Sequence, residues 1–241
     1  MQRLDKFLSD SKVASRRELR QIIRAGRVRV GERVVREPEY KVDEKNDEIF
    51  LDGVRVGGAR RIVLMFHKPA GFVTSTADPR DRTVMELLPP QYRDLTPVGR
   101  LDKDTEGLLL FTNDGQLVHR LISPRRGVEK CYYAEHEGTA DVQDIAAFRE
   151  GVELRDGTKC LPARLEPQGP GKSLVYVCEG KYHQVRRMLA SRGKPVTYLR
   201  RIAEGGVQLG ELPIGKTREL TNEELSLLDS VHFDEAEGSG I

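Results

Sequence analysis

The chain has no tryptophan, only three cysteines and no long apolar run, and each shortage excludes a class of protein. Cys131, Cys160 and Cys178 are an odd number without a C-x-x-C pair, which excludes the usual zinc spacings and a disulfide framework. We therefore expect three reduced thiols in a cytoplasmic protein. Because no apolar stretch approaches about 20 residues and the N-terminus has no signal-peptide pattern, we expect no membrane segment.

What is abundant is charge, and it is unevenly distributed along the 241 residues. The net charge is only +2, but residues 1–36 alone carry +7. A basic segment of this kind favours a polyanion partner, because neutralised phosphates release their counterions. Residues 219–241 carry −7, and we expect residues 230–241 to form an acidic, disordered tail. A chain of this length holds one large domain or two small ones.

The basic head has the pattern of short helices followed by strands. Ser15 and Glu18 form an S-x-x-E capping box and Gly26 supplies a stop, which predicts a helix over residues 15–26. The apolar face of this helix carries Leu19, Ile22 and Ile23, and another face carries Arg16, Arg20 and Arg24. A shorter apolar set predicts a preceding helix at about residues 3–9, and "RVRV", "RVV" and "DEIFLDG" predict strands.

Residues 1–55 resemble the S4 RNA-binding domain, and the stretch "SRRELRQIIRAGRVRVGERVV" carries the resemblance. In that family the arginine-lined helix lies against structured RNA. The resemblance implies RNA contacts by Arg16, Arg17, Arg20, Arg24 and Arg27. The alternative is an exposed face that arginines merely solvate. Acids are nearly missing from this face, which leaves no i,i+4 ion pairs and favours nucleic acid.

A glycine- and arginine-rich stretch, "DGVRVGGARR" at residues 52–61, marks a domain boundary, with a linker over residues 56–61. Residues 62–229 form the larger domain. Strands are predicted at "RIVLMFHKPAGF", "LLLFTNDGQL", "KCYYAEHEG" and "SLVYVCEG", and helices at "GQLVHRLIS", "TADVQDIAAFREG" and "EGKYHQVRRMLASRG". Because strands with turn-linked neighbours outnumber helical crossovers, we expect an α+β fold with a mixed, mostly antiparallel sheet.

The segment "GRLDKDTEGLLLFTND" places Asp102 and Asp104 beside an apolar strand, and several chemistries compete for them. A phosphate-binding loop at "GPGKS" is excluded because Glu166 stands where the first glycine is required. A magnesium-dependent phosphatase stays an alternative, although Thr105 follows Asp104 directly and the D-x-D-x-T pattern fails. The histidine spacings predict no metal site, and G-x-S-x-G does not occur.

A carboxylate that works without metal is the remaining choice. An ionised aspartate is a nucleophile that needs no activating base, but it needs a partly dry site, a cation and an aromatic surface. Arg186 and Arg187 flank the apolar face of the helix expected over residues 179–193, and Tyr132 and Tyr133 lie on opposite faces of a strand. Surface and core roles stay open for these residues, and spacing alone does not bring the three segments together.

Four segments resemble the signatures of the RsuA-type (RsuA/RluB/E/F) rRNA pseudouridine synthases over about residues 60–225. They are "HKPAGFVTST", "GRLDKDTEGLLLFTNDG", "EKCYYA" and "EGKYHQVRRM". The resemblance implies that Asp102 attacks the target uridine and that Tyr132 packs on the flipped base. It also implies that Arg186 pairs with the catalytic carboxylate, whereas Asp104 is a turn or capping residue.

Further residues of these segments are expected to contact the substrate. They are Lys68, Arg100, His183 and Arg187. Ala134 stands where the family usually has valine, which affects only the packing of that strand.

The implied reaction breaks the N1–C1′ bond of a uridine that has left its stack, turns the base and rejoins it through C5. Asp102 adds to C1′ or assists departure of the base, and both routes stay open. The resemblance implies no cofactor, no metal and a monomer acting on ribosomal RNA. "KYHQVRRM" and "TSTADP" favour 16S rRNA, with 23S rRNA as the alternative. A non-catalytic S4-domain assembly protein is the alternative of another class, and the intact Asp102, Tyr132 and Arg186 argue against it.

Overall fold

The computed structural model describes residues 1–11, 13–44, 47–56 and 61–230. The chain divides into two compact units, Met1–Arg61 and Ile62–Ile241, and each has a core of its own. Residues 57–60 of the expected linker and residues 231–241 of the expected acidic tail lie outside the described residues.

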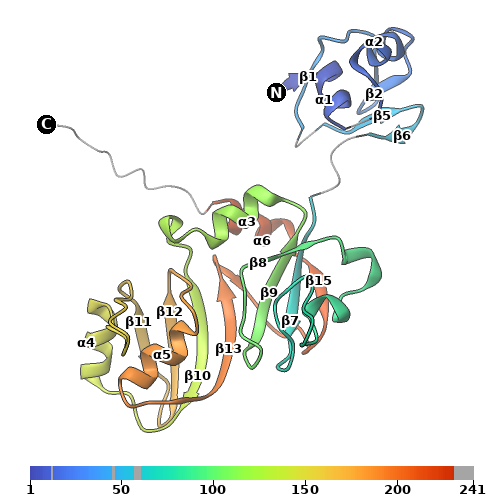
Figure 1. Ribbon diagram of the computed structural model, residues 1–241. Coiled ribbons are helices and arrows are strands. Elements are labelled where there is room, and N and C mark those ends of the chain that lie inside the picture. The colour runs from blue at the N-terminus through green and yellow to red at the C-terminus, as the bar shows by residue number, and fades with distance from the viewer. Residues whose placement is uncertain (12, 45–46, 57–60, 231–241) are drawn as a thin grey trace, which may run out of the picture. The chain divides into compact units, whose positions relative to one another are not determined.

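The first unit combines two helices with short strands (Figure 1). Its elements are β1 (Gln2–Arg3), α1 (Leu4–Asp10), α2 (Arg16–Arg24), β2 (Val28–Val30), β3 (Arg33–Val35), β4 (Lys41–Val42), β5 (Ile49–Leu51) and β6 (Val54–Arg55). One sheet has the order β3-β2-β5-β6, and β1 pairs with β4. Two helices followed by strands is the predicted arrangement, whereas β1, β4 and β6 were not predicted, because strands of two residues carry almost no periodicity.

The predicted capping box begins α2. The main-chain N–H of Ser15 donates to the Glu18 carboxylate at 2.9 Å, and the N–H of Glu18 donates to the Ser15 hydroxyl at 3.4 Å. Gly26 follows the helix at a φ of +76°, a conformation that glycine adopts without strain. Leu19 and Ile23 are buried in the core of the unit, so the arginine face of α2 is turned outward.

The second unit is built on a nine-stranded sheet. Its strands are β7 (Val63–Lys68), β8 (Thr96–Val98), β9 (Glu106–Thr112), β10 (Lys130–His136), β11 (Arg164–Pro167), β12 (Lys172–Val177), β13 (Val196–Glu204), β14 (Val207–Gln208) and β15 (Thr217–Glu219). Its α-helices are α3 (Gly115–Ile122), α4 (Val142–Glu150), α5 (Gln184–Ser191) and α6 (Asn222–Asp229), and three 3₁₀ turns are Val84–Leu87, Pro90–Tyr92 and Pro124–Arg126. The predicted α+β class is confirmed.

The strand order is β11-β12-β10-β13-β9-β7-β15, with β14 on β13 and β8 on β9. Among the named strands, only β13 and β9 pair in parallel, so the sheet is mixed and mostly antiparallel, as predicted. This pairing joins Glu106 and Gly107 to Arg200 and Arg201. A Cβ on Gly107 would lie 2.2 Å from the Arg201 carbonyl oxygen, so only glycine permits this close approach.

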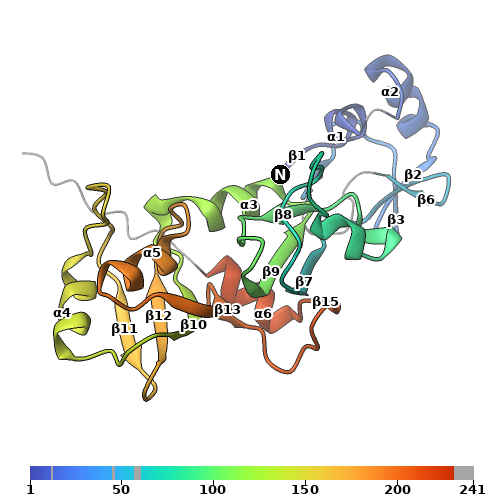
Figure 2. The ribbon, with the colours of Figure 1, turned by 60° about the horizontal axis from the view of Figure 1, so that its bottom comes forward.

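Three apolar clusters surround the sheet of this unit. The first packs α4 and α5 on the half formed by β10 to β13, on one face of those strands (Figure 2). The second packs α3 and α6 on β7 and β9, and the third packs the segment 84–101 on the other face of the same two strands. Because both faces of β7 and β9 are covered, both read as continuous apolar runs. Tyr132 packs against the first and third clusters and so lies where they meet.

Candidate active site

Asp102 lies in the loop that leads into β9, and a buried lysine holds the main chain of this loop. Lys68, at the end of β7, has no exposed surface. Its ammonium donates hydrogen bonds at 2.8–3.4 Å to the carbonyl oxygens of Pro69, Asp102, Lys103 and Thr105. Burial lowers the pKa of Lys68 to about 8 despite the nearby carboxylates. The expected substrate contact of Lys68 is therefore wrong, because its donors face the protein main chain and position the loop.

A second polar side chain fixes the same loop. The Thr74 hydroxyl donates to the carbonyl oxygen of Leu101 at 2.9 Å and accepts from the Leu101 N–H at 3.1 Å. Thr74 is buried, so these bonds replace those that the Leu101 main chain would otherwise make to water. The sequence analysis missed Thr74, because a threonine in the irregular stretch after β7 gives no periodic signal.

The Asp102 carboxylate is half-buried, with 29% of its side chain exposed. Its Oδ1 lies 3.5 Å from Nε2 of His183. Burial raises the pKa of Asp102, and the charge of Asp104 raises it further. His183, Arg186 and Lys68 act in the opposite direction and favour the ionised form. Because burial is the largest of these effects, the pKa of Asp102 lies above the ordinary aspartate value.

Arg186 is oriented by the other aspartate of the pair. Its Nη2 lies 3.0 Å from Oδ2 of Asp104, and its Nη1 donates to the carbonyl oxygen of Val196 at 3.4 Å. The expected ion pair with Asp102 is therefore not the one formed, because the Asp102 carboxylate faces His183. Asp104 is more than a turn or capping residue, since it holds the guanidinium. Arg186 still lies close enough to Asp102 to lower the pKa of that carboxyl.

The helix expected over residues 179–193 is shorter, because α5 begins only at Gln184. The buried Glu179 carboxylate accepts hydrogen bonds from the Leu161 N–H and the Gln184 side chain, both at 2.8 Å, which holds the preceding residues as a loop. His183 has a φ of +47°, a left-handed conformation that is rare for a residue with a Cβ. This conformation carries the imidazole toward Asp102 and not along the helix.

The core residues expected on the apolar face of the same helix are confirmed. Val185, Met188 and Leu189 are buried against the strands of the first cluster.

Tyr132 and Tyr133 point to opposite faces of β10, as predicted. Tyr132 faces the side of the sheet that α5 covers, and the ring of Tyr133 contacts Tyr198 with centroids 6.3 Å apart. Burial is the main cause that raises the pKa of Tyr132, and the negative charge of Asp102 adds to the increase. The structure therefore brings Asp102, Tyr132 and Arg186 into one site, which spacing alone could not do.

Arg201 is a buried partner of this site that the sequence analysis missed. It pairs with Tyr132 across the strands, and its Nε donates to the Leu108 carbonyl oxygen at 2.7 Å. The positive charge of Arg201 lowers the pKa of Tyr132 against the larger effect of burial. Its Nη2 lies 3.3 Å from Glu204, which is also fully buried. The alternation of Leu199 and Arg201 along β13 is a signal that would have placed this arginine on the covered face.

Two of the remaining residues that were predicted to contact the substrate differ in whether other side chains already bind them. Arg187 pairs with Asp156 and donates to the Tyr182 carbonyl oxygen at 3.3 Å, whereas Arg100 is exposed.

On the first unit, Arg16, Arg17 and Arg24 are exposed. Arg20 pairs with the buried Asp5 at 3.3 Å, and Nε of Arg27 donates to Asp52 at 2.9 Å. Arg20 therefore has an acidic partner from outside α2. Its partner lies on α1, a neighbour that the i,i+4 rule within one helix cannot reveal.

Groups that would hold a metal are not assembled in the described part of the chain, where no three His, Cys, Asp or Glu side chains cluster suitably. The three cysteines are free thiols. No helix among the described residues is long and apolar enough to span a bilayer. The site thus offers the half-buried carboxylate of Asp102, the cationic side chains of Lys68 and Arg186 near it, and an aromatic ring. This combination suits attack on an electrophilic carbon.

Comparisons with known proteins agree on two families. The chain matches the model of RNA pseudouridylate synthase over residues 62–191 and that of the S4 domain over residues 2–49. An uncharacterised RNA pseudouridine synthase of Bacillus subtilis (strain 168) is 41% identical over 94% of this chain and 98% of its own length.

Two further relatives extend the likeness to a named enzyme and to a solved structure. The ribosomal small subunit pseudouridine synthase A of Pseudomonas aeruginosa is 38% identical over 92% of this chain and 98% of its own length. A crystal structure of a pseudouridylate synthase superimposes with a TM-score of 0.67 at 33% identity, covering 95% of this chain and 100% of that one.

Proposed function

Since the chain belongs to the RNA pseudouridine synthase family and carries an S4 domain, we propose that it converts a uridine of ribosomal RNA into pseudouridine. The observation that carries this proposal is the placement of Asp102. Its carboxylate is half-buried, its loop is held by Lys68, and His183 and Arg186 favour its ionised form. A carboxylate in such surroundings is a nucleophile that needs no separate base.

Asp102 acts on the ribose carbon from which the base departs. Its carboxylate either adds to C1′ or assists departure of the base, and in both routes the N1–C1′ bond breaks. The freed uracil turns so that C5 faces C1′, and a C5–C1′ bond forms; in the addition route the bond between Asp102 and C1′ breaks in the same step and returns the carboxylate. C5 then loses its proton and N1, which had carried the glycosidic bond, gains one, so the product is an isomer of the substrate. The overall balance needs no oxidant, reductant or other co-reactant.

Tyr132 holds the extruded base in this proposal. Taking a uridine out of its stack costs a few kcal/mol, and stacking on an aromatic ring offsets part of that cost. Tyr132 lies at the meeting point of two apolar clusters, which supports a pocket wall from which water is excluded. Arg201 lies beside this ring, opposite Tyr132 in the pairing of β10 and β13, and its charge acts on the phenol group.

The substrate we propose is 16S rRNA, with 23S rRNA as the alternative. The support is the likeness to a protein named ribosomal small subunit pseudouridine synthase A, at 38% identity over nearly the whole chain. The first unit contributes RNA affinity through the exposed arginines of α2, which face away from its core.

Release of tritium from C5-labelled uridine in 16S rRNA tests this proposal. The wild-type chain should release tritium in the presence of a chelator, whereas Asp102→Asn, which keeps the size and removes the charge, should release none. Asp104→Asn is the matched control and should retain release. Release from 23S rRNA only would overturn the 16S assignment, and equal release by wild type and Asp102→Asn would show that another carboxylate attacks.

A further inference from the structure

Tyr182 is an aromatic side chain that the fold leaves uncovered. Tyr182 is 75% exposed, and the other aromatic residues that the structure describes are buried or half-buried. An isolated exposed ring needs no explanation. Tyr182, however, is neither isolated nor free to move.

The Tyr182 ring is stacked on His183, next to the candidate nucleophile. The two ring centroids lie 3.9 Å apart with an angle of 16° between the planes, so one face of the tyrosine is covered and the other is open. The edge of the same imidazole lies 3.5 Å from Asp102. Tyr182 is therefore one ring away from the side chain that contacts the catalytic carboxylate.

The main chain around this pair is fixed by its own hydrogen bonds. Arg187 donates to the Tyr182 carbonyl oxygen at 3.3 Å, and the Lys181 N–H donates to the Gln184 side chain at 2.9 Å. The left-handed φ of +47° at His183 sets the angle at which the two rings leave the chain. Strained conformations of this kind persist where the surroundings hold them, and they cluster at functional sites. The open face of Tyr182 is thus preorganised.

We infer that the open face of Tyr182 is a stacking platform for an RNA base that flanks the target uridine. The inference rests on the proposed function. Every base has a π face, and stacking on exposed aromatic side chains is the usual way in which proteins hold single-stranded or splayed nucleotides. A base on Tyr182 is separated from Asp102 by the His183 ring. It therefore belongs to a neighbouring nucleotide and not to the one whose C1′ meets Asp102.

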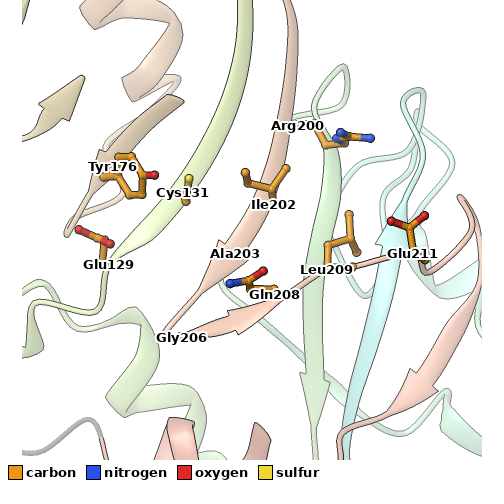
Figure 3. A pocket seen from close by; sticks show the side chains of 11 residues that line it. Glu129, Cys131, Tyr176, Arg200, Ile202, Ala203, Gly206, Gln208, Leu209 and Glu211 are labelled. Carbon is orange, nitrogen blue, oxygen red and sulfur yellow. The ribbon is translucent and has the colours of Figure 1, made fainter. Parts of the chain in front are cut away.

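The absence of tryptophan from the sequence permits a direct test. Tyr182→Trp introduces the only indole of the chain at the platform, and a base stacked on it should quench its fluorescence. Tyr176→Trp is the matched control. Tyr176 lies on the face of β12 that α5 does not cover, and it lines the cavity of about 520 Å³ shown in Figure 3. The probe is unmodified 16S rRNA transcribed in vitro, and filter binding measures its affinity independently.

Quenching of the Tyr182→Trp indole at the RNA concentrations that give filter binding, without quenching in Tyr176→Trp, is the expected result. RNA binding by Tyr182→Trp without quenching would overturn the platform, and so would equal quenching in the two variants.

Kinetics on the same RNA supply the second readout. Tyr182→Ala and Tyr182→Leu should raise KM by roughly 5- to 150-fold, as loss of one stacked base predicts, with kcat nearly unchanged. Tyr182→Phe should behave like the wild type. Equal KM values for the alanine variant and the wild type would overturn the inference. If the wild type makes no pseudouridine but the indole is quenched, the proposed function fails, and with it the target uridine, whereas the stacking of an RNA base on Tyr182 is upheld.

Discussion

Arg186 forms its ion pair with Asp104, 3.0 Å away, and leaves Asp102 to face His183 at 3.5 Å. The two aspartates are two residues apart and have different tasks. Asp104 is 64% exposed and Asp102 only 29%, so the outer carboxylate holds the guanidinium and the inner one is kept dry. Both neighbours act on the pKa of Asp102, the like charge of Asp104 raising it and the charge of Arg186 lowering it.

The acid limb of the activity profile should therefore move in opposite directions in two variants. The reaction needs ionised Asp102, so activity is lost as the pH falls through its pKa. Asp104→Asn removes a like charge, lowers that pKa and shifts the acid limb of kcat/KM to lower pH. Arg186→Gln removes an opposite charge, raises the pKa and shifts the limb to higher pH. Tritium release measured across the acid range checks both signs, and parallel shifts would contradict the assignment of Asp102.

Lys68→Met should unfold the protein more easily and abolish activity, because the Lys68 ammonium binds the main chain of the Asp102 loop. The variant leaves carbonyl oxygens of the Asp102 loop without their buried donor, at a cost of about 3–5 kcal/mol in the free energy of unfolding. Urea unfolding measures this cost. Full stability of the variant would show that water replaces the ammonium.

The same lysine predicts a pH dependence of stability. Its pKa is lowered to about 8 in the fold, from the ordinary lysine value of 10.5 in the unfolded chain. Between these values the native state binds fewer protons than the unfolded state, so stability rises with pH. From pH ~7.5 to ~9.5 the wild type should gain about 2 kcal/mol relative to Lys68→Met. Urea unfolding at both pH values checks this. A difference in stability between wild type and Lys68→Met that stays the same at the two pH values would contradict the lowered pKa of Lys68.

Arg201→Met should destabilise the second unit by about 3–5 kcal/mol, because it leaves the buried Glu204 carboxylate with only Lys130, 3.9 Å away, as a cationic neighbour. The double variant Arg201→Met/Glu204→Met should regain part of this loss, since apolar side chains of similar volume replace the pair while Lys130 loses its carboxylate. Activity should stay low in both variants, because Tyr132 loses the cationic neighbour opposite it on β13. Thermal unfolding and tritium release together separate stability from positioning. A double variant as unstable as the single one would show that Arg201 stabilises through contacts other than Glu204.

The elements of the fold that could be predicted are those with local signals. The capping box at Ser15 and Glu18, the apolar run of β7 and the stop at Gly151 after α4 each depend on residues close in sequence. The helix expected over residues 179–193 was predicted too long at its start. The buried Glu179, which accepts a hydrogen bond from the Leu161 N–H, and the left-handed φ of His183 keep residues 179–183 out of α5.

The site could be predicted only in part, because the contacts between its side chains join residues that are distant in sequence. The segments of Asp102, Tyr132 and Arg186 meet through a sheet whose order depends on distant pairings. Which aspartate Arg186 binds is a matter of side-chain orientation, and two carboxylates two residues apart look alike in sequence. The burial of Lys68 was equally hidden, since a lysine before proline at a strand end looks exposed until the loop that covers it is placed.

The arginines of α2 should differ in their effect on RNA affinity according to whether the fold already uses them. Arg16→Ala and Arg24→Ala each remove an exposed charge, and each should weaken binding of 16S rRNA and reduce the slope of log K against log salt by roughly 1. Arg20→Ala is the matched control on the same helix, because its guanidinium is paired with Asp5 at 3.3 Å. It should change the slope less and instead lower the stability of the first unit, by roughly 0.5–1 kcal/mol. Filter binding over a salt series measures the slopes. Identical slopes for the wild type, Arg16→Ala and Arg24→Ala would remove α2 from the RNA interface, and the first unit would then have to bind RNA through another of its basic surfaces.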